Sequence, residues 1–286
     1  MHKLNAGEQD NARIPFVIYH ANCADGFTAA WAVSKAYPDA EFFAANYGEA
    51  PPKVIDRDVI IVDFSYKKAM LEKLMTQAKS LILLDHHQTA EADLKSFKHQ
   101  HATVVFDMNR SGAGIAWDFF QVSKRKLLID YVEDRDLWHF KLPHSREINS
   151  FIFSHEYTFE NWDMLDHYIN HRFEVVVESG TAIERKHFKD IAELLKATER
   201  RMTIGGYNVP VANMPYTLSS DAANIMAVKN QAPFAACYMD GNEGVRTFSL
   251  RSNKDGIDVS KIAQQYGGGG HCHAAGFRRP IGWEGE

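Results

Sequence analysis

Short apolar runs alternate with helix-like stretches through the first half of the sequence, and this alternation limits the fold to a few classes. Stretches with a helical spacing of apolar residues separate the runs, notably at 24–38 and 67–79. Strands that alternate with helices in this way predict a parallel sheet with helices on both faces. The apolar runs are PFVIYH at 15–20, AEFFAAN at 40–46, DVIIVDFS at 58–65, SLILLDHH at 80–87 and ATVVFD at 102–107.

The rest of the chain predicts two further regions. Residues 110–140 have a helical pattern, with Ser111 as a candidate N-cap. A polar, charged stretch follows at 158–203 and predicts helices, and beyond it strands and helices come in mixed order. A chain of 286 residues favours two domains. We therefore predict an α/β chain with a mostly parallel N-terminal domain at 14–157, a helical connector at 158–203 and a smaller mixed α/β domain at 204–282.

Polar side chains follow three of the predicted strands at the point where each strand ends. They are His20, Asp63 and the consecutive residues Asp85, His86 and His87. Parallel strands end at one edge of their sheet, and ligands of such folds bind at that edge. The sequence therefore predicts that these side chains lie close together.

A set of carboxylates and imidazoles is typical of a divalent metal site. Carboxylate oxygens suit Mn²⁺ and Mg²⁺, and imidazole shifts the preference toward transition metals, so the mixed set favours Mn²⁺. Two such ions generate a hydroxide and neutralise the charge that develops on a phosphate. Each residue alone also has a structural explanation, such as a helix cap for Asp25. The candidate donors are His20, Asp25, Asp63, Asp85, His86, His87 and Asp134.

Four consecutive glycines precede His271 in GGGGHCHAAGF, at 267–277. Each glycine costs conformational entropy on folding, so a run of four indicates backbone amides that approach an anionic ligand closely. Arg251, in SLRS, could add a charge-assisted contact to a phosphate. A flexible loop is the alternative. The candidate substrate-binding residues of this region are Arg251, Gly268, Gly269, Gly270 and His271.

The segment NRSGAGIAWDFF, at 109–120, is a second candidate for phosphate binding. Arg110 and Ser111 open a predicted helix, and amides at a helix start favour anions. An ordinary capped helix with close packing explains the same residues.

Composition excludes several classes of protein. The net charge is −5 without a long basic block, which argues against binding of long duplex DNA. No run approaches the roughly 18 apolar residues of a membrane span. Three cysteines cannot form a disulfide framework, so a cytoplasmic location is expected.

Two of these motifs resemble known families. DHH at 85–87 after an apolar strand, His20 followed by Asp25-Gly26, and Asp63 after an intervening strand resemble the DHH phosphoesterase superfamily. GGGGHCHAAGF, preceded by SLRS and DVSKIAQQY, is similar to the DHH-associated domain of RecJ-like exonucleases and nanoRNases. The two signatures occur in the order of that family and span nearly the whole chain.

The resemblance implies a role for each matching residue. His20, Asp25, Asp63, His86 and Asp134 would be metal ligands for two Mn²⁺ ions, with Asp63 as the bridge. Asp85 would orient a neighbouring histidine, and His87 would face the scissile phosphate. The spacing to Phe140 favours Asp134 over Asp136 and Glu133.

The segment NCADG departs from the family pattern, because Cys23 stands where many members carry an acid. As a thiolate ligand, Cys23 would favour Zn²⁺ or Fe²⁺ over Mn²⁺ or Mg²⁺. Packing in the turn before the helix is the alternative.

Together these features predict a metal-dependent phosphodiesterase that hydrolyses short oligonucleotides or dinucleotides to mononucleotides. Two alternatives remain open. One is a signalling phosphodiesterase for cyclic or linear dinucleotides or other small phosphorylated nucleotides; the other is a nucleic-acid-binding module without activity, for which Cys23 is the argument. The expected partner is the short nucleotide substrate, without a membrane, and a homodimer is compatible with the sequence.

Overall fold

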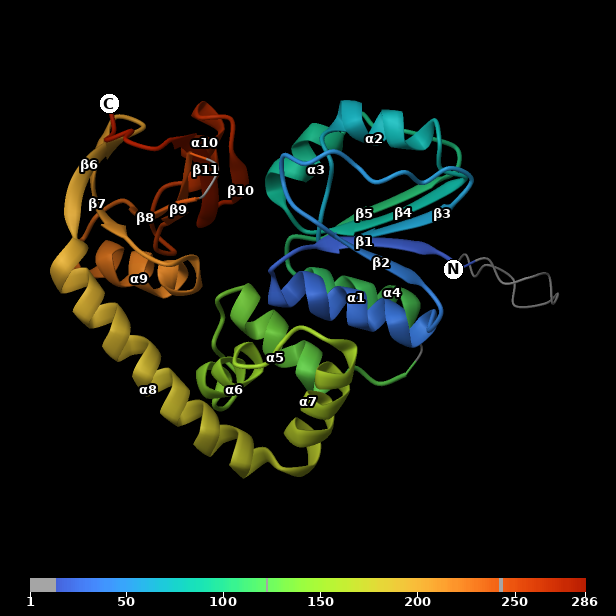
Figure 1. Ribbon diagram of the computed structural model, residues 1–286, viewed down its shortest axis with the longest axis horizontal. Coiled ribbons are helices and arrows are strands. Elements are labelled where there is room, and N and C mark those ends of the chain that lie inside the picture. The colour runs from blue at the N-terminus through green and yellow to red at the C-terminus, as the bar shows by residue number, and fades with distance from the viewer. Residues whose placement is uncertain (1–13, 122, 242–243) are drawn as a thin grey trace. The chain divides into compact units, whose positions relative to one another are not determined.

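The computed structural model describes residues 14–121, 123–241 and 244–286. Its internal contacts divide the chain into two compact units. The first unit consists of the chain up to His86, Asp93–Ser145 and His155–Arg172, and the second consists of His87–Ala92, Arg146–Ser154 and Phe173–Glu286. Each unit is built around its own sheet (Figure 1).

The sheet of the first unit has five parallel strands in the order β2-β1-β3-β4-β5. The strands are β1 (Phe16–His20), β2 (Glu41–Ala45), β3 (Asp58–Val62), β4 (Ser80–Asp85) and β5 (Ala102–Phe106). Val59–Val62 of β3 are all buried, as expected for a central strand that is covered on both faces. The α/β class and all five predicted strands are confirmed.

Helices cover both faces of this sheet. Figure 1 shows α2 on one face and α1 and α4 on the other. Ala29 and Ala30 of α1 are fully buried, and such small side chains allow a helix to approach its neighbours closely. The helices of the unit are α1 (Ala24–Ala36), α2 (Lys68–Met75), α4 (Gly112–Phe120), α5 (Leu127–Asp136) and α7 (Phe159–His171). Two others, α3 (Gln88–Leu94) and α6 (Ser145–Phe153), contain residues of both units.

The second unit has a six-stranded mixed sheet in the order β10-β11-β9-β8-β7-β6. Only β7 and β8 pair in parallel. One face packs against α10 through a core that includes Phe248 and Phe277, and the other packs against α9 through Met226 and Cys237. The strands are β6 (Arg200–Ile204), β7 (Tyr207–Asn213), β8 (Ala235–Asp240), β9 (Val245–Arg251), β10 (Gly269–His271) and β11 (Ala274–Pro280). The helices are α8 (Phe173–Thr198), α9 (Tyr216–Lys229) and α10 (Val259–Gln265).

The 26-residue helix α8 is amphipathic, with four buried residues. Ion pairs four residues apart, Lys186–Asp190 and Lys189–Glu193, lie on its surface. Among the described residues, no helix combines the length and the apolarity needed to cross a bilayer.

The predicted helical connector at 158–203 is wrong at its end. Helices α7 and α8 fill most of this range, but β6 begins at Arg200. The strand forms because Gly205 and Gly206, both with positive φ, make a tight turn that pairs β6 with β7.

Candidate metal centre

The strand register aligns the polar strand ends of the first unit. Tyr19 pairs with Val62 and Val62 pairs with Leu84, so the next residues, His20, Asp63 and Asp85, end their strands at one level. The strand order changes direction between β1 and β3, because β2 lies on one side of β1 and β3 on the other. Ligands of open parallel sheets bind at this kind of switch point. His20 and Asp63 occupy it.

Asp63 lies between two imidazoles. Its Oδ1 is 3.1 Å from His86 Nε2, and its Oδ2 is 3.6 Å from His20 Nδ1. Its backbone continues the ladder through a hydrogen bond from Asp63 N to Leu84 O of 2.9 Å, but then turns with φ +51°. Aspartate is among the few side chains that tolerate this left-handed backbone.

Asp25 lies in the first turn of α1 and is only 2% exposed. Its carboxylate accepts hydrogen bonds from Gly112 N (2.6 Å) and Ala113 N (3.0 Å), at the start of α4. The helix start predicted to favour an anion therefore holds Asp25. Asp25 Oδ2 is also 3.6 Å from His86 Nε2, so this carboxylate joins the cluster around Asp63.

Two glycines make the cluster sterically feasible. A Cβ at Gly112 would lie 2.4 Å from Asp63 Cβ, and a Cβ at Gly26 would lie 2.5 Å from the His20 carbonyl oxygen. Neither residue was predicted as part of the site, since only the folded chain shows what surrounds them.

Burial and like charge shape the electrostatics of the cluster. Burial and the nearby carboxylates of Asp63 and Asp136 raise the pKa of Asp25 well above its ordinary value. Burial alone lowers the pKa of His86, but the hydrogen bond with Asp63 and the charges of Asp136, Asp63 and Asp25 raise that pKa to about 11. Burial, followed by the charges of Asp63, Asp136 and Asp25, raises the pKa of the Cys23 thiol. A bound cation would relieve this repulsion.

The donor atoms fit a metal centre with a shared ligand. Asp25, Asp63 and His86 bring one donor atom each within 4.8 Å of one another, and so do His20, Cys23 and Asp63. Asp63 belongs to both sets, as the predicted bridge requires. Mixed oxygen and nitrogen donors suit Mn²⁺, and the sulfur of Cys23 suits softer ions.

The acid of α5 that approaches this cluster is Asp136, not the predicted Asp134. Asp136 Oδ2 is 3.6 Å from His86 Nε2. The Asp134 carboxylate instead accepts hydrogen bonds from Lys141 N (3.0 Å) and Leu142 N (3.2 Å). The third candidate, Glu133, accepts a hydrogen bond from Ser111 N at the start of α4.

Asp134 stabilises the turn that follows α5. Its backbone oxygen also accepts hydrogen bonds from the amides of His139 and Phe140. Trp138 and Phe140 have φ of +58° and +49°, which for such bulky residues costs about 1–3 kcal/mol each. The hydrogen bonds to Asp134 maintain this unfavourable conformation.

We expect Asp134→Ala to lower the free energy of unfolding by about 2–3 kcal/mol, because the amides of Lys141 and Leu142 lose their acceptor. Urea denaturation would measure the loss. Asp130→Ala is the matched control on the same helix: its half-buried carboxylate forms an ion pair with Arg125, and its removal should cost at most about 1 kcal/mol. Equal losses for the two variants would contradict the assignment.

Asp85 is fully buried at the end of β4. It accepts hydrogen bonds from Ser65 Oγ (2.5 Å) and from the backbone amide of His86 (2.7 Å). Asp85 thus fixes the backbone that carries His86.

In the second unit, the ring of His87 stacks on that of His271, with centroids 4.5 Å apart.

Arg110 and Ser111 have structural partners at the start of α4. Arg110 forms an ion pair with Asp118, and Ser111 Oγ accepts a hydrogen bond from Gly114 N of 3.1 Å. Ser111 is thus the predicted N-cap. These contacts fit the ordinary capped helix that was the alternative to phosphate binding.

Arg251 and His271 lie at one level of the second sheet, each paired with Ala274 on the strand between them. Residues paired in this way point to the same face, so both side chains flank a small alanine. Arg251 Nη2 donates a hydrogen bond to Ser220 Oγ (2.8 Å).

The glycine run is less open than a loop. Gly269 and Gly270 belong to β10, and a Cβ at Gly268 would lie 2.0 Å from the Gly276 oxygen. Close packing against β11 therefore accounts for Gly268. Gly270, with φ +139°, also meets β11 closely, since its Cβ would lie 2.5 Å from the Ala274 oxygen.

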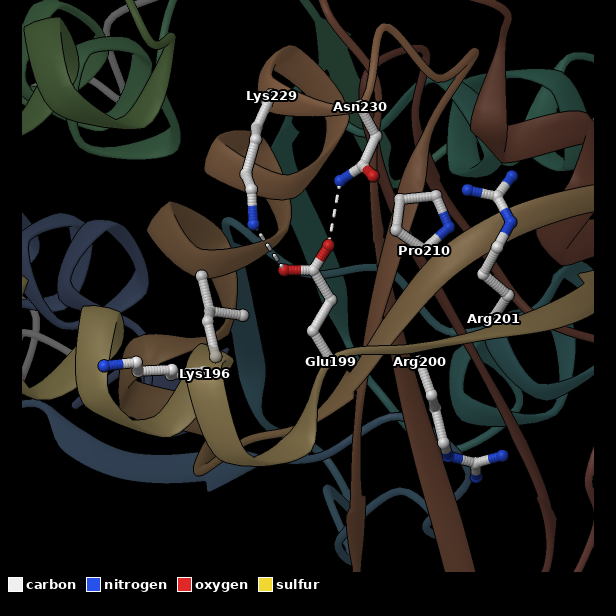
Figure 2. A pocket seen from close by; sticks show the side chains of 8 residues that line it. Lys196, Glu199, Arg200, Arg201, Pro210, Lys229 and Asn230 are labelled. Carbon is white, nitrogen blue, oxygen red and sulfur yellow. Dashed lines mark hydrogen bonds and ion pairs between the residues drawn. The ribbon is translucent and has the colours of Figure 1, made fainter.

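A hollow of about 380 Å³ in the second unit lies beside the junction of α8 and β6. Figure 2 shows Glu199 in hydrogen-bonding contact with Lys229 and Asn230, whereas Arg200 and Arg201 extend away from it. The Glu199 carboxylate already pairs with the Lys229 ammonium, so this hollow is a weaker candidate site than the acid–histidine cluster.

The fold of this chain is similar to those of solved DHH-domain structures. No protein-family model matches the sequence. An uncharacterized protein of Acanthamoeba polyphaga mimivirus is 27% identical, over 93% of this chain and 67% of its own length. The solved DHH domain of PF0399, a member of the s1p family of ribosomal proteins, is similar with a TM-score of 0.50 at 12% identity, over 92% of this chain and 82% of that one. PggH from Vibrio cholerae, a pGpG-specific phosphodiesterase, gives a TM-score of 0.49 at 15% identity, over 94% of both chains.

Proposed function

Because the chain has the fold of a DHH-domain protein, we propose that it is a metal-dependent phosphodiesterase that hydrolyses short oligonucleotides or dinucleotides to mononucleotides. The observation that carries the proposal is the buried set of Asp25, Asp63 and His86, with donor atoms within 4.8 Å of one another. Buried carboxylates at this density are costly unless a cation compensates them.

In this proposal the metal donors come from five strand or helix ends, namely those of β1, β3, β4 and α5 and the start of α1. When bound, a pair of divalent ions supplies an activated water and neutralises the charge on a phosphate. The chain's own part is to hold the donors in place, and the contacts of Asp25 with the start of α4 and of Asp85 with the His86 amide do so. The proposed donors are His20, Cys23, Asp25, Asp63, His86 and Asp136.

The remaining residues act on the substrate. We propose that His87 contacts the scissile phosphate. Arg251 and His271 would bind a phosphate at the end of the substrate away from the scissile bond. A guanidinium and an imidazole on one face of a sheet suit such an anion, because hydrogen bonds between ionised groups are roughly twice as strong as those between neutral groups.

Metal-depleted protein should be inactive, and Mn²⁺ should restore release of mononucleotides from linear dinucleotides. The test is incubation with linear di- to decanucleotides, cyclic dinucleotides and pyrophosphate, with products separated by chromatography. The same panel with Zn²⁺ or Fe²⁺ examines the influence of Cys23 on metal choice.

The outcomes separate the alternatives. Preferential turnover of a cyclic dinucleotide would favour a signalling phosphodiesterase. If the protein hydrolyses no compound of the panel with any of these metals but binds oligonucleotides, it is a nucleic-acid-binding module rather than an enzyme.

A further inference from the structure

Arg135, Trp138 and Phe140 form a group of stacked side chains at the turn after α5. The Arg135 guanidinium lies 4.2 Å from the centroid of the Trp138 ring and 5.5 Å from that of Phe140. The two rings meet edge to face at 5.0 Å. All three side chains are half-buried rather than part of a core. The group, called the aromatic turn below, therefore combines a cation with two aromatic rings whose planes are 75° apart.

The backbone of the aromatic turn is unfavourable for the residues that form it. Trp138 and Phe140 both have left-handed backbones, which glycine or asparagine would adopt at little cost. A segment needed only to reverse the chain would have no use for two large rings there. Strain that the surrounding structure maintains is typical of ligand-binding segments, and Asp134 maintains it here with four hydrogen bonds.

The aromatic turn is also close in the sequence to a residue of the proposed reaction centre. Asp136 lies between Arg135 and Trp138 in the sequence, and its carboxylate lies 3.6 Å from His86 Nε2. Two residues of extended chain span at most about 7 Å, so the backbone of Trp138 lies within that distance of the backbone of Asp136.

We propose that the aromatic turn is a stacking site for a nucleobase of the substrate. The inference rests on the proposed function and adds the residues that would hold a base of the nucleotide substrate. Every base has a π face, so stacking tolerates different bases, and an arginine adds cation–π attraction. We therefore expect little preference among the four bases at this position.

The test compares two variants of Trp138. Trp138→Asn removes the ring but retains a side chain that tolerates the left-handed backbone, and Trp138→Phe retains a ring. Trp138→Asn should raise KM for a dinucleotide about tenfold and leave KM for an abasic ribose phosphodiester unchanged. Trp138→Phe should remain within about threefold of the wild type. Phe119→Ala, which removes an exposed ring from α4, is the control and should leave both substrates unaffected.

Binding gives a readout that does not require turnover. A non-hydrolysable dinucleotide phosphorothioate should quench the tryptophan emission of the wild type, and Trp138→Phe should lose that quenching although four other tryptophans remain. Equal quenching in both proteins would overturn the proposal. So would a Trp138→Asn variant whose KM for the dinucleotide is unchanged, or whose kcat falls equally on the dinucleotide and on the abasic phosphodiester. A wild type that binds and is quenched without hydrolysing anything would refute the phosphodiesterase while leaving the stacking site intact.

Discussion

Asp63→Ala should lower kcat/KM for the best substrate of the panel by on the order of 1,000-fold or more, because it removes the only donor shared by the two proposed metal-ligand sets. Asp63→Asn should have a similar effect, since asparagine tolerates the left-handed backbone at this position but provides no negative charge. Steady-state kinetics with saturating Mn²⁺, together with metal analysis of the purified protein, would measure both losses.

Asp107→Asn is the matched control. Asp107 follows the neighbouring strand β5, and its side chain accepts a hydrogen bond from Asn109 N rather than joining the cluster. We expect activity within about twofold of the wild type, as for a surface substitution. An Asp63→Asn variant as active as this control would remove Asp63 from the metal centre.

Gly112→Ala should lower kcat/KM about 100-fold without changing any proposed ligand. The new Cβ would lie 2.4 Å from Asp63 Cβ, so α4 and Asp63 must move apart, and Asp25 would lose the 2.6 Å hydrogen bond from Gly112 N. A displacement of about 1 Å at a reacting centre costs on the order of 100-fold in rate.

Gly241→Ala controls for the loss of a glycine as such. Among the residues that the structure describes, its Cβ would meet only the Val245 oxygen, at 3.4 Å, and the variant should retain full activity. Metal titration by calorimetry would locate the defect of Gly112→Ala: weaker metal binding supports the steric account, and wild-type metal binding with wild-type kinetics would contradict it.

The strands and the edge of the sheet that carries the acid–histidine cluster could be predicted from the sequence because both follow from local patterns. Apolar runs with polar ends identify the strands, and parallel pairing then brings His20 and Asp63 to the same level. Asp25 and His86 follow from their positions next to those ends. The predicted cluster of His20, Asp25, Asp63 and His86 is present in the structure, and their roles as ligands stay predictions.

The choice between Asp134 and Asp136 could not be made from the sequence. Two residues that are two positions apart on a helix are rotated by about 200° around its axis, which places them on nearly opposite sides, so only one faces a given site. Both are acids at the end of α5, and the difference arises from the turn that follows, where the amides of Lys141 and Leu142 take the Asp134 carboxylate. Gly26 and Gly112 were missed for a related reason: their value lies in contacts with residues distant in the sequence.

The division of the chain has a consequence for its biosynthesis. The proposed metal donors, from His20 to Asp136, all belong to the first unit, which ends at Arg172. Domains fold from the N-terminus as the ribosome proceeds at about 5–20 residues per second, so the first unit has several seconds to fold before Phe173–Glu286 has been completed. A nascent chain that does not yet carry Arg251 or His271 therefore already contains every proposed metal donor, so the proposed metal binding could precede synthesis of the residues assigned to the substrate's phosphate.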